Sequence, residues 1–364
     1  MPVAEPIYLD NNATTPLRAE AIAAIQQAMG PPANPSSVHG FGRQARLLVE
    51  DARESLGVLV GCRAQDVVFT SGGTEANNLA LSGFSNVITS MIEHDSVLQS
   101  APRASLLPVT GDGVVDLAIL KQMVEVIPAK KREKTIVSVM AANNETGVIQ
   151  PLAEIVEIAS EAGLATHSDM VQILGKAHID LATIDLDFVS FSAHKIGGPT
   201  GVGALVVRSG KSLTSLLRGG GQEQGRRSGT ENLLGITGFG AAAVAAFGDV
   251  AHFRQMADWR DDFEAAVGAV RPDVALFGTG APRIGNTSCL ALSGKASETL
   301  VMALDIAGFA VSAGSACSSG KVKASHVLSA MGAGEKAAQA IRVSGGWQTH
   351  REDFERLAQV LAGL

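Results

Sequence analysis

The stretch TIVSVM at residues 135–140, followed by a helical pattern over residues 152–162 and the short run ATHSD at residues 165–169, decides the fold. The first segment is almost entirely apolar and rich in β-branched residues, which is typical of a strand buried on both faces of a sheet. The second begins just after Pro151 and repeats its apolar residues at helical spacing. A strand, a helix and a strand in this order predict two parallel strands joined by a crossover, and therefore an α/β fold.

The same alternation continues on both sides of this unit. Further strand-like runs lie at residues 66–70, 86–90, 188–192 and 203–208. Beyond about residue 250 the pattern changes, and helical patterns at residues 253–270, 296–307, 325–331 and 350–361 alternate with strand-like runs at residues 283–292 and 309–311. We therefore expect a large domain with a mostly parallel sheet, followed by a smaller α+β domain.

The composition argues against several classes of protein. The chain has 364 residues, of which 46% are hydrophobic, and a net charge of −7, so it lacks the basic character of nucleic-acid-binding proteins. The longest apolar run, residues 233–248, is too short for a membrane span and predicts a buried helix. The N-terminal residues show no secretory signal, and the three cysteines form no CxxC pair. We therefore expect a cytoplasmic protein with no nucleic-acid or membrane partner.

A glycine turn between a strand and a helix is the first candidate for a binding site. It reads TSGGTE at residues 70–75, and such a turn lets backbone N–H groups approach a phosphate at the positive end of the helix. It lacks the lysine and the spacing of a nucleotide-binding P-loop. Taken alone, an ordinary strand-to-helix turn is the more common explanation of this pattern.

A lysine and an aspartate each follow a strand further along the chain. Lys195 ends the run SFSAHK at residues 190–195 and precedes the glycine-rich stretch IGGPTG, where partial desolvation would free its amine for Schiff-base chemistry. Asp169 ends the run ATHSD, and a carboxylate is what the ring nitrogen of pyridoxal phosphate requires. Both are expected at the carboxyl edge of the sheet, where open α/β sheets bind ligands. A solvated lysine and a helix-capping aspartate are the alternatives for each residue alone.

Ten short segments in a fixed order carry a resemblance to a known family. They are YLDNNATTP at 8–16, NPSS at 34–37, SGGTE at 71–75, EH at 93–94, NNETG at 143–147, Asp169 with Gln172, SAHK at 192–195, RRSGT at 226–230, SACSS at 315–319 and IR at 341–342. On these segments the chain resembles the cysteine desulfurases of the NifS and IscS type, within the class V aminotransferase-like pyridoxal-phosphate enzymes. The resemblance spans essentially the whole chain.

The resemblance implies a fold and a division into domains. The fold is that of type I pyridoxal-phosphate enzymes, with a mostly parallel seven-stranded sheet in a large cofactor-binding domain. This domain is expected over residues 16–250. Residues 1–15 and 251–364 are expected to form the smaller α+β domain that carries the catalytic cysteine.

The resemblance also implies a role for each matching residue toward pyridoxal 5′-phosphate. Lys195 binds the cofactor as a Schiff base, Asp169 pairs with the ring nitrogen and Gln172 contacts the phenolic oxygen. His94 stacks on the ring and takes part in proton transfer. The phosphate group is held by Gly73, Thr74, Ser192 and His194, joined by Thr230 of the partner subunit.

Substrate binding is implied for a second set of residues. Asn144, beside the cofactor, and Arg342 are expected to hold the substrate carboxylate, Arg342 by a bidentate pair, and Asn34 is expected to line the same pocket. The histidines outside the motifs show no metal-ligand spacing, so no metal site is expected.

Cys317 is expected to be the residue that accepts sulfur. It lies in SAGSACSSG at residues 312–320, where small polar side chains predict a mobile segment that exposes the thiol. Cys62 and Cys289 are expected to be small buried hydrophobic residues. The chain departs from the family pattern at Met170, which follows the ring-nitrogen aspartate, and at residues 322–325, which read VKAS.

The resulting functional hypothesis is a homodimeric cysteine desulfurase. It would convert L-cysteine to L-alanine and transfer the sulfur to Cys317 as a persulfide, for delivery to acceptors such as iron–sulfur cluster assembly proteins. One alternative is another enzyme of the same fold, such as a selenocysteine lyase or a small-substrate aminotransferase; an aminotransferase would not need Cys317. The other is a non-catalytic assembly protein that keeps the fold as a binding module, against which Lys195 argues.

Overall fold

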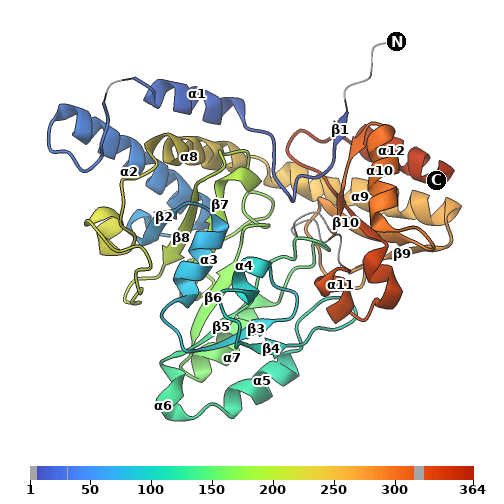
Figure 1. The fold of residues 1–364 in the computed structure, drawn as a ribbon, viewed down its shortest axis with the longest axis horizontal. Helices are drawn as coiled ribbons and strands as arrows, with labels where there is room; N and C mark the ends of the chain where they lie inside the picture. Colours follow the sequence, from blue (N-terminus) through green and yellow to red (C-terminus); the bar gives the residue numbers. More distant parts are fainter. Residues whose placement is uncertain (1–5, 31, 315–323) are drawn as a thin grey trace.

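The computed structural model describes residues 6–30, 32–314 and 324–364, and its largest sheet has seven strands (Figure 1). Their order across the sheet is β2-β8-β7-β6-β5-β3-β4. All neighbouring pairs are parallel except the two that β8 forms with β2 and β7, so the expected mostly parallel sheet is confirmed. The strands are β2 (Val67–Thr70), β3 (Asn86–Ser90), β4 (Ser105–Leu107), β5 (Thr135–Ser138), β6 (Ala165–Asp169), β7 (Phe188–Ser192) and β8 (Gly203–Val207).

Helices cover both faces of this sheet. Along β7, Phe188 packs against the face that carries α3 (Gly73–Leu81) and α4 (Asp95–Leu98), whereas Val189 and Phe191 pack on the opposite face. This alternation follows from the two-residue period of a strand, and burial on both faces explains the nearly continuous apolar runs in the sequence. The helices of the opposite face include α2 (Gly40–Val60), α5 (Leu117–Glu125), α7 (Leu152–Glu161) and α8 (Leu233–Phe247).

The remainder of the chain forms two smaller sheets. Antiparallel strands in the order β12-β13-β10-β9 make a four-stranded sheet, and β1 pairs in parallel with β11. These strands are β1 (Ile7–Tyr8), β9 (Val274–Leu276), β10 (Thr287–Leu292), β11 (Phe309–Ala310), β12 (Ser312–Ala313) and β13 (Ala340–Ser344). The helices not yet described are α1 (Ala19–Ala28), α6 (Ala129–Arg132), α9 (Val250–Val270), α10 (Ser297–Ile306), α11 (His326–Ala330) and α12 (Arg351–Gly363).

The domain boundaries stay a prediction, which the hydrophobic clusters support. One cluster draws only on residues 21–246, whereas another joins Leu9 to residues between Phe253 and Leu361. A further cluster packs Ile92, which follows β3 of the large sheet, against buried residues between Cys289 and Ala340. The N-terminal segment therefore packs with the C-terminal part of the chain.

Helix α8 is apolar because it is largely buried. Within the described residues, no single helix is long and apolar enough to cross a membrane, while α8 and α9 together meet that criterion across a 64° bend. Two glycines in α8 let neighbouring helices approach closely. A Cβ atom at Gly240 would lie 2.6 Å from Ala52 Cα in α2, and one at Gly238 would lie 2.8 Å from Ile25 Cδ1 in α1.

Replacing Gly240 with Ala should therefore destabilise the protein. We expect the free energy of unfolding to fall by about 1–3 kcal/mol, because the α2 backbone must move away from α8. Gly268→Ala in α9 is the matched control: nothing lies within 4 Å of its Cβ position, and we expect a gain of about 0.5–1 kcal/mol. Urea unfolding of both variants checks this, and equal effects would contradict the packing argument.

Candidate active site

A pocket of about 270 Å³ opens where β6 and β7 end and α3 begins. It brings together most of the residues singled out in the sequence. Those that line it are Gly73, Thr74, His94, Asn144, Asp169, Gln172, Ser192, His194 and Lys195, together with Ala13, Asn77, Ser96, Met140, Ala142 and Val171. The parallel strands β6 and β7 place Asp169 and Lys195 at the same edge of the sheet, as in other open α/β sheets that bind ligands.

Lys195 lies in a short turn that follows β7. Its Nζ atom donates to the backbone oxygens of Asn12 (2.5 Å) and Ala13 (2.8 Å), which belong to the N-terminal segment. The hydroxyl and the amide of Thr15 both donate to the His194 carbonyl oxygen, so the same segment is fastened to the lysine turn. The amine is therefore held at the pocket by residues that lie more than 170 positions earlier.

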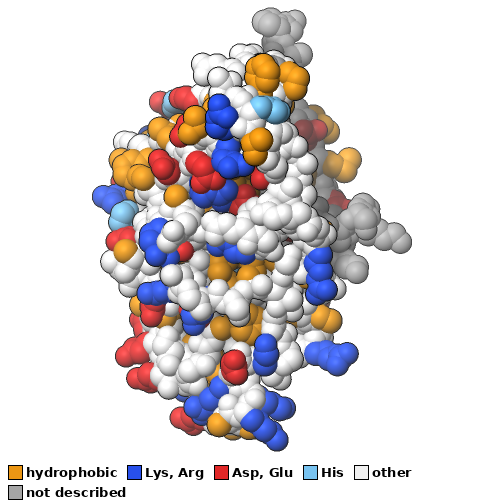
Figure 2. All heavy atoms as spheres, turned by 90° about the vertical axis from the view of Figure 1, so that its left-hand side faces the viewer, with side chains coloured by type: hydrophobic (Ala, Val, Ile, Leu, Met, Phe, Trp, Pro, Cys, Tyr) orange, Lys and Arg blue, Asp and Glu red, His pale blue; other side chains and the backbone are white. Residues whose placement is uncertain are grey.

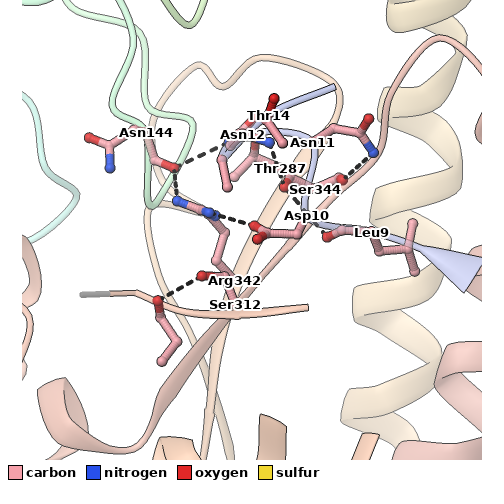
Figure 3. A network of polar contacts seen from close by, with 12 residues as sticks. Leu9, Asp10, Asn11, Asn12, Thr14, Asn144, Thr287, Ser312, Arg342 and Ser344 are labelled. Atoms are coloured by element: carbon pink, nitrogen blue, oxygen red, sulfur yellow. Dashed lines mark hydrogen bonds and ion pairs between the residues drawn. The ribbon is translucent and has the colours of Figure 1, made fainter. Parts of the chain in front are cut away.

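Asn12 is the residue that joins this pocket to the smaller sheets (Figure 3). Its side-chain amide donates to Thr287 Oγ1 (2.8 Å) and to the Asn144 carbonyl oxygen (3.2 Å). Its Oδ1 atom accepts from Lys176 Nζ at 2.9 Å, and its backbone oxygen accepts from Gln172 Nε2 at 3.0 Å. The sequence analysis quoted Asn12 only as part of a motif, because nothing local reveals contacts over such separations.

Asp169 is oriented by two hydrogen bonds. Asn77 Nδ2 donates to its Oδ2 atom at 2.7 Å, and the Val171 amide donates to its Oδ1 atom at 3.0 Å. Asn77 Oδ1 is buried without a hydrogen-bond partner among the described residues. The carboxylate is thus fixed at the pocket wall, where a protonated ring nitrogen can pair with it.

The ring of His94 is held through Ser96. The Ser96 amide donates to His94 Nδ1 at 3.1 Å, and Ser96 Oγ lies 2.8 Å from the same nitrogen. Because an amide N–H can only donate, Nδ1 is an acceptor and the neutral ring carries its proton on Nε2. Asn77 also donates to Ser96 Oγ, at 2.9 Å, so one asparagine orients the supports of both Asp169 and His94. The sequence analysis missed both Asn77 and Ser96.

The part of the pocket lined by the start of α3 suits a phosphate group. The first amides of α3, at Gly73 and Thr74, have no partner within the helix and lie at its positive end. A Cβ atom at residue 73 would approach Val171 Cγ2 to 3.0 Å, so glycine keeps this space open. Burial and the nearby Lys195 charge lower the pKa of His194 to about 4, which leaves a neutral imidazole. The lysine, the aspartate and this anion cradle together fit pyridoxal phosphate.

Two of the predicted residues, Arg342 and Thr230, do not line the pocket. The Arg342 guanidinium is buried, with its terminal nitrogens donating to Asp10 Oδ1 (2.6 Å) and to the Asn144 carbonyl oxygen (3.1 Å), as Figure 3 shows. Thr230 is exposed and lines a separate small hollow with Ser71 and Arg227. Both roles stay predictions.

The two other expectations differ in outcome. Asn34 is exposed, accepts a hydrogen bond from the Ser36 amide and does not line the pocket. Cys317, the predicted sulfur acceptor, lies outside the described residues.

The other two cysteines are poor nucleophiles. Cys289 is fully buried, and burial raises the pKa of its thiol far above the ordinary range. Burial also raises the pKa of Cys62 to about 12, although this residue, which we expected to be buried, is only partly buried. Neither thiol ionises near neutral pH, which is what a sulfur acceptor requires. Within the described residues, no group of three or more His, Cys, Asp or Glu side chains is arranged to hold a metal ion.

The fold and this pocket define a class of protein. The model of the family "Aminotransferase class-V" matches residues 7–357, and the chain belongs to that family. It is 40% identical to a cysteine desulfurase of Cereibacter sphaeroides, with 98% of this chain and 95% of the relative covered. It is 37% identical to the cysteine desulfurase IscS of Dictyoglomus turgidum, with 98% of this chain and 93% of the relative covered.

The solved structures agree. A NifS-like protein from Rickettsia africae superposes with a TM-score of 0.90 at 33% identity, with 99% of both chains covered. The resemblance inferred from the motifs is therefore confirmed, as are the type I fold and pyridoxal phosphate as the cofactor of this family.

Glu93, next to His94, is a buried acid that the sequence analysis did not interpret. Its Oε1 atom accepts from Ser90 Oγ (2.5 Å) and the Met140 amide (2.9 Å), while Oε2 has no partner among the described residues. Burial raises the pKa of Glu93 to about 8, so the folded protein holds this carboxyl protonated at neutral pH.

Glu93→Gln should therefore stabilise the protein in a pH-dependent way. In the unfolded chain a glutamate titrates near 4.3, so the wild-type protein loses stability as the pH rises from about 4 to about 8. The variant lacks this loss, and we expect it to gain roughly 2–4 kcal/mol relative to wild type above pH 8 and little near pH 4. Urea unfolding at both pH values, with the exposed Glu157→Gln as a control for removing a charge, measures the difference. A gain that does not vary with pH would contradict the protonated state.

Proposed function

We propose that this chain is a pyridoxal-phosphate-dependent cysteine desulfurase. It converts L-cysteine to L-alanine and keeps the removed sulfur on Cys317 as a persulfide. The observation that carries the proposal is the convergence of Lys195, Asp169 and the amino end of α3 on one pocket. The relatives at 37–40% identity that bear the name cysteine desulfurase support it.

The cofactor, when bound, supplies an electron sink that makes the Cα proton of the substrate acidic. Lys195 and His94 both line the pocket and are the groups that move that proton in this proposal, Lys195 through Nζ. Asp169 keeps the ring nitrogen protonated, because Asn77 and Val171 hold its carboxylate in place.

The substrate carboxylate binds at the edge of the pocket nearest to Arg342. Asn144 lines the pocket, and its backbone oxygen already receives a hydrogen bond from this arginine. Arg342 Nε has no hydrogen-bond partner among the described residues, so the guanidinium retains a donor for an additional acceptor. A planar guanidinium suits a carboxylate better than a lysine would, because it can donate two parallel hydrogen bonds.

Sulfur transfer requires a thiolate. The Cys317 sulfur attacks the sulfur of the bound cysteine, forming an S–S bond while the substrate C–S bond breaks. The electron pair of that bond passes to the substrate carbon, which takes up a proton on the way to alanine. The net reaction is one cysteine and one thiol in, one alanine and one persulfide out, with no external oxidant. A sulfur acceptor protein, such as one that assembles iron–sulfur clusters, then receives the persulfide sulfur.

A homodimer in the cytoplasm is the proposed assembly. Figure 2 shows hydrophobic side chains gathered near the middle of the face that lies on the left of Figure 1. In the groove between α2 and α8, Val58, Val244 and Phe247 are each more than half exposed and line one hollow of about 500 Å³. Burying such apolar surface favours association, and a dimer would let the exposed Thr230 reach the partner's cofactor phosphate.

Cys317→Ser tests the reaction. We expect alanine and persulfide formation from L-cysteine to fall together, on the order of 10²-fold or more, because no other described thiol ionises near neutral pH. The visible absorbance of the lysine-bound cofactor should persist, which shows that the variant folds and binds cofactor. Cys62→Ser is the matched control and should retain activity.

The same assay separates the alternatives. Retained transamination in the Cys317→Ser variant would favour an aminotransferase. A wild-type protein that binds no pyridoxal phosphate would favour a non-catalytic module.

A further inference from the structure

A short loop between β8 and α8 has a strained backbone. Glu223 and Gln224 have φ angles of 47° and 58°, and within the described residues they are the non-glycine residues with positive φ. Gly225 follows with φ of 78°, so three consecutive residues have left-handed backbone. Residues with a Cβ atom seldom adopt this conformation, and it persists only where the surrounding structure holds it.

A buried ion pair holds the strained residues. Arg53 from α2 donates through both terminal nitrogens to the Glu223 carboxylate, at 2.8 and 2.9 Å, and the Glu223 side chain is only 2% exposed. The Phe69 amide of β2 adds a third hydrogen bond to Glu223, at 3.1 Å. Arg53 is fixed in turn, because it donates to the Val67 carbonyl oxygen and lies over the Phe69 ring. The loop is thereby attached to two rigid elements of the core.

The other end of the loop reaches the turn that precedes α3. Arg227 Nε donates to Glu75 Oε1 at 2.9 Å, and the second oxygen of Glu75 accepts from the Ser71 amide at 2.7 Å. Burial raises the pKa of Glu75, but the hydrogen bonds from Arg227 and Ser71 outweigh it and the pKa is lowered overall, so Glu75 is ionised. Glu75 therefore connects Arg227 to the turn whose next residues, Gly73 and Thr74, line the cofactor pocket.

We propose that residues 222–230 form a strained brace, held by Arg53 and Glu223, that positions the phosphate-binding turn through Arg227 and Glu75. None of these four side chains lines the pocket, so they act as positioning residues. The left-handed backbone at residues 223–225 turns the chain so that Glu223 points into the core while Arg227 reaches Glu75. The link between the brace and pyridoxal phosphate rests on the proposed function.

The test compares two glutamates that contact the same arginine. Glu223→Gln removes the buried partner of Arg53, whereas Glu50→Gln removes an exposed contact at 3.2 Å, which makes it the matched control. Titrating the full-length apoprotein with pyridoxal phosphate, followed by absorbance, gives the dissociation constant. We expect it to rise about tenfold in Glu223→Gln and to stay within about twofold of wild type in Glu50→Gln. Equal changes in both variants would overturn the proposal.

A second variant separates bracing from simple loss of a buried pair. Gln224→Gly removes the side chain that makes the left-handed backbone unfavourable at this residue. The loop therefore keeps its native shape more readily when the Arg53–Glu223 ion pair is absent. Added to Glu223→Gln, it should recover about threefold in cofactor affinity; by itself it should leave the affinity unchanged. A double variant that binds no better than Glu223→Gln would show that the loop geometry is not what the pair supports.

This outcome is independent of the proposed reaction. Cofactor binding to the apoprotein does not involve Cys317. A chain that forms no alanine but shows these changes in affinity would overturn the proposed function and support the brace. A protein that forms alanine but whose cofactor affinity does not change in Glu223→Gln would support the proposed function and overturn the brace.

Discussion

The structure depends on the hydrogen bonds made by one buried residue, Asn12. Its backbone oxygen accepts hydrogen bonds from Lys195 and Gln172, and its side-chain oxygen accepts one from Lys176. Its side-chain amide donates to Thr287, which belongs to the smaller four-stranded sheet. A polar group removed from water is costly unless each donor and acceptor is paired, so the large sheet and the smaller sheets can come together only in a register that satisfies it. The position of the reactive amine is therefore set by the way the two parts of the chain meet.

Burial also lowers the pKa of two basic side chains in the interior, which disfavours their charged forms. Burial lowers the pKa of His167 to about 3 and that of Lys176 well below its ordinary value, the latter with help from the Lys195 and Arg342 charges. His167 lies between two serine hydroxyls, and Lys176 donates to two amide oxygens. Both shifts disfavour positive charge in the buried interior of the protein.

The sequence analysis succeeded where the evidence was local. β5, β6 and β7 were predictable because burial on both faces leaves apolar runs, and Asp169 and Lys195 followed because strand ends meet at one edge. The expected strand over residues 283–292 begins only at Thr287. β13 was not predicted, since Arg342 interrupts its apolar pattern, and β4 and β9 are three residues each. Asn77 and Asn12 escaped notice because their contacts join distant segments, and the antiparallel direction of β8 leaves no mark in its composition.

The antiparallel direction of β8 also has a consequence for the order in which the chain assembles during translation. β2 pairs only with β8, so residues 67–70 remain an unpaired edge until residues 203–207 have left the ribosome. The N-terminal segment waits longer still, because Asp10 and Asn11 bind Arg342 and Ser344 across more than 330 positions. A nascent chain can thus pair all the strands of its large sheet well before the N-terminal segment, which contributes Ala13 to the pocket, gains its contacts with β13.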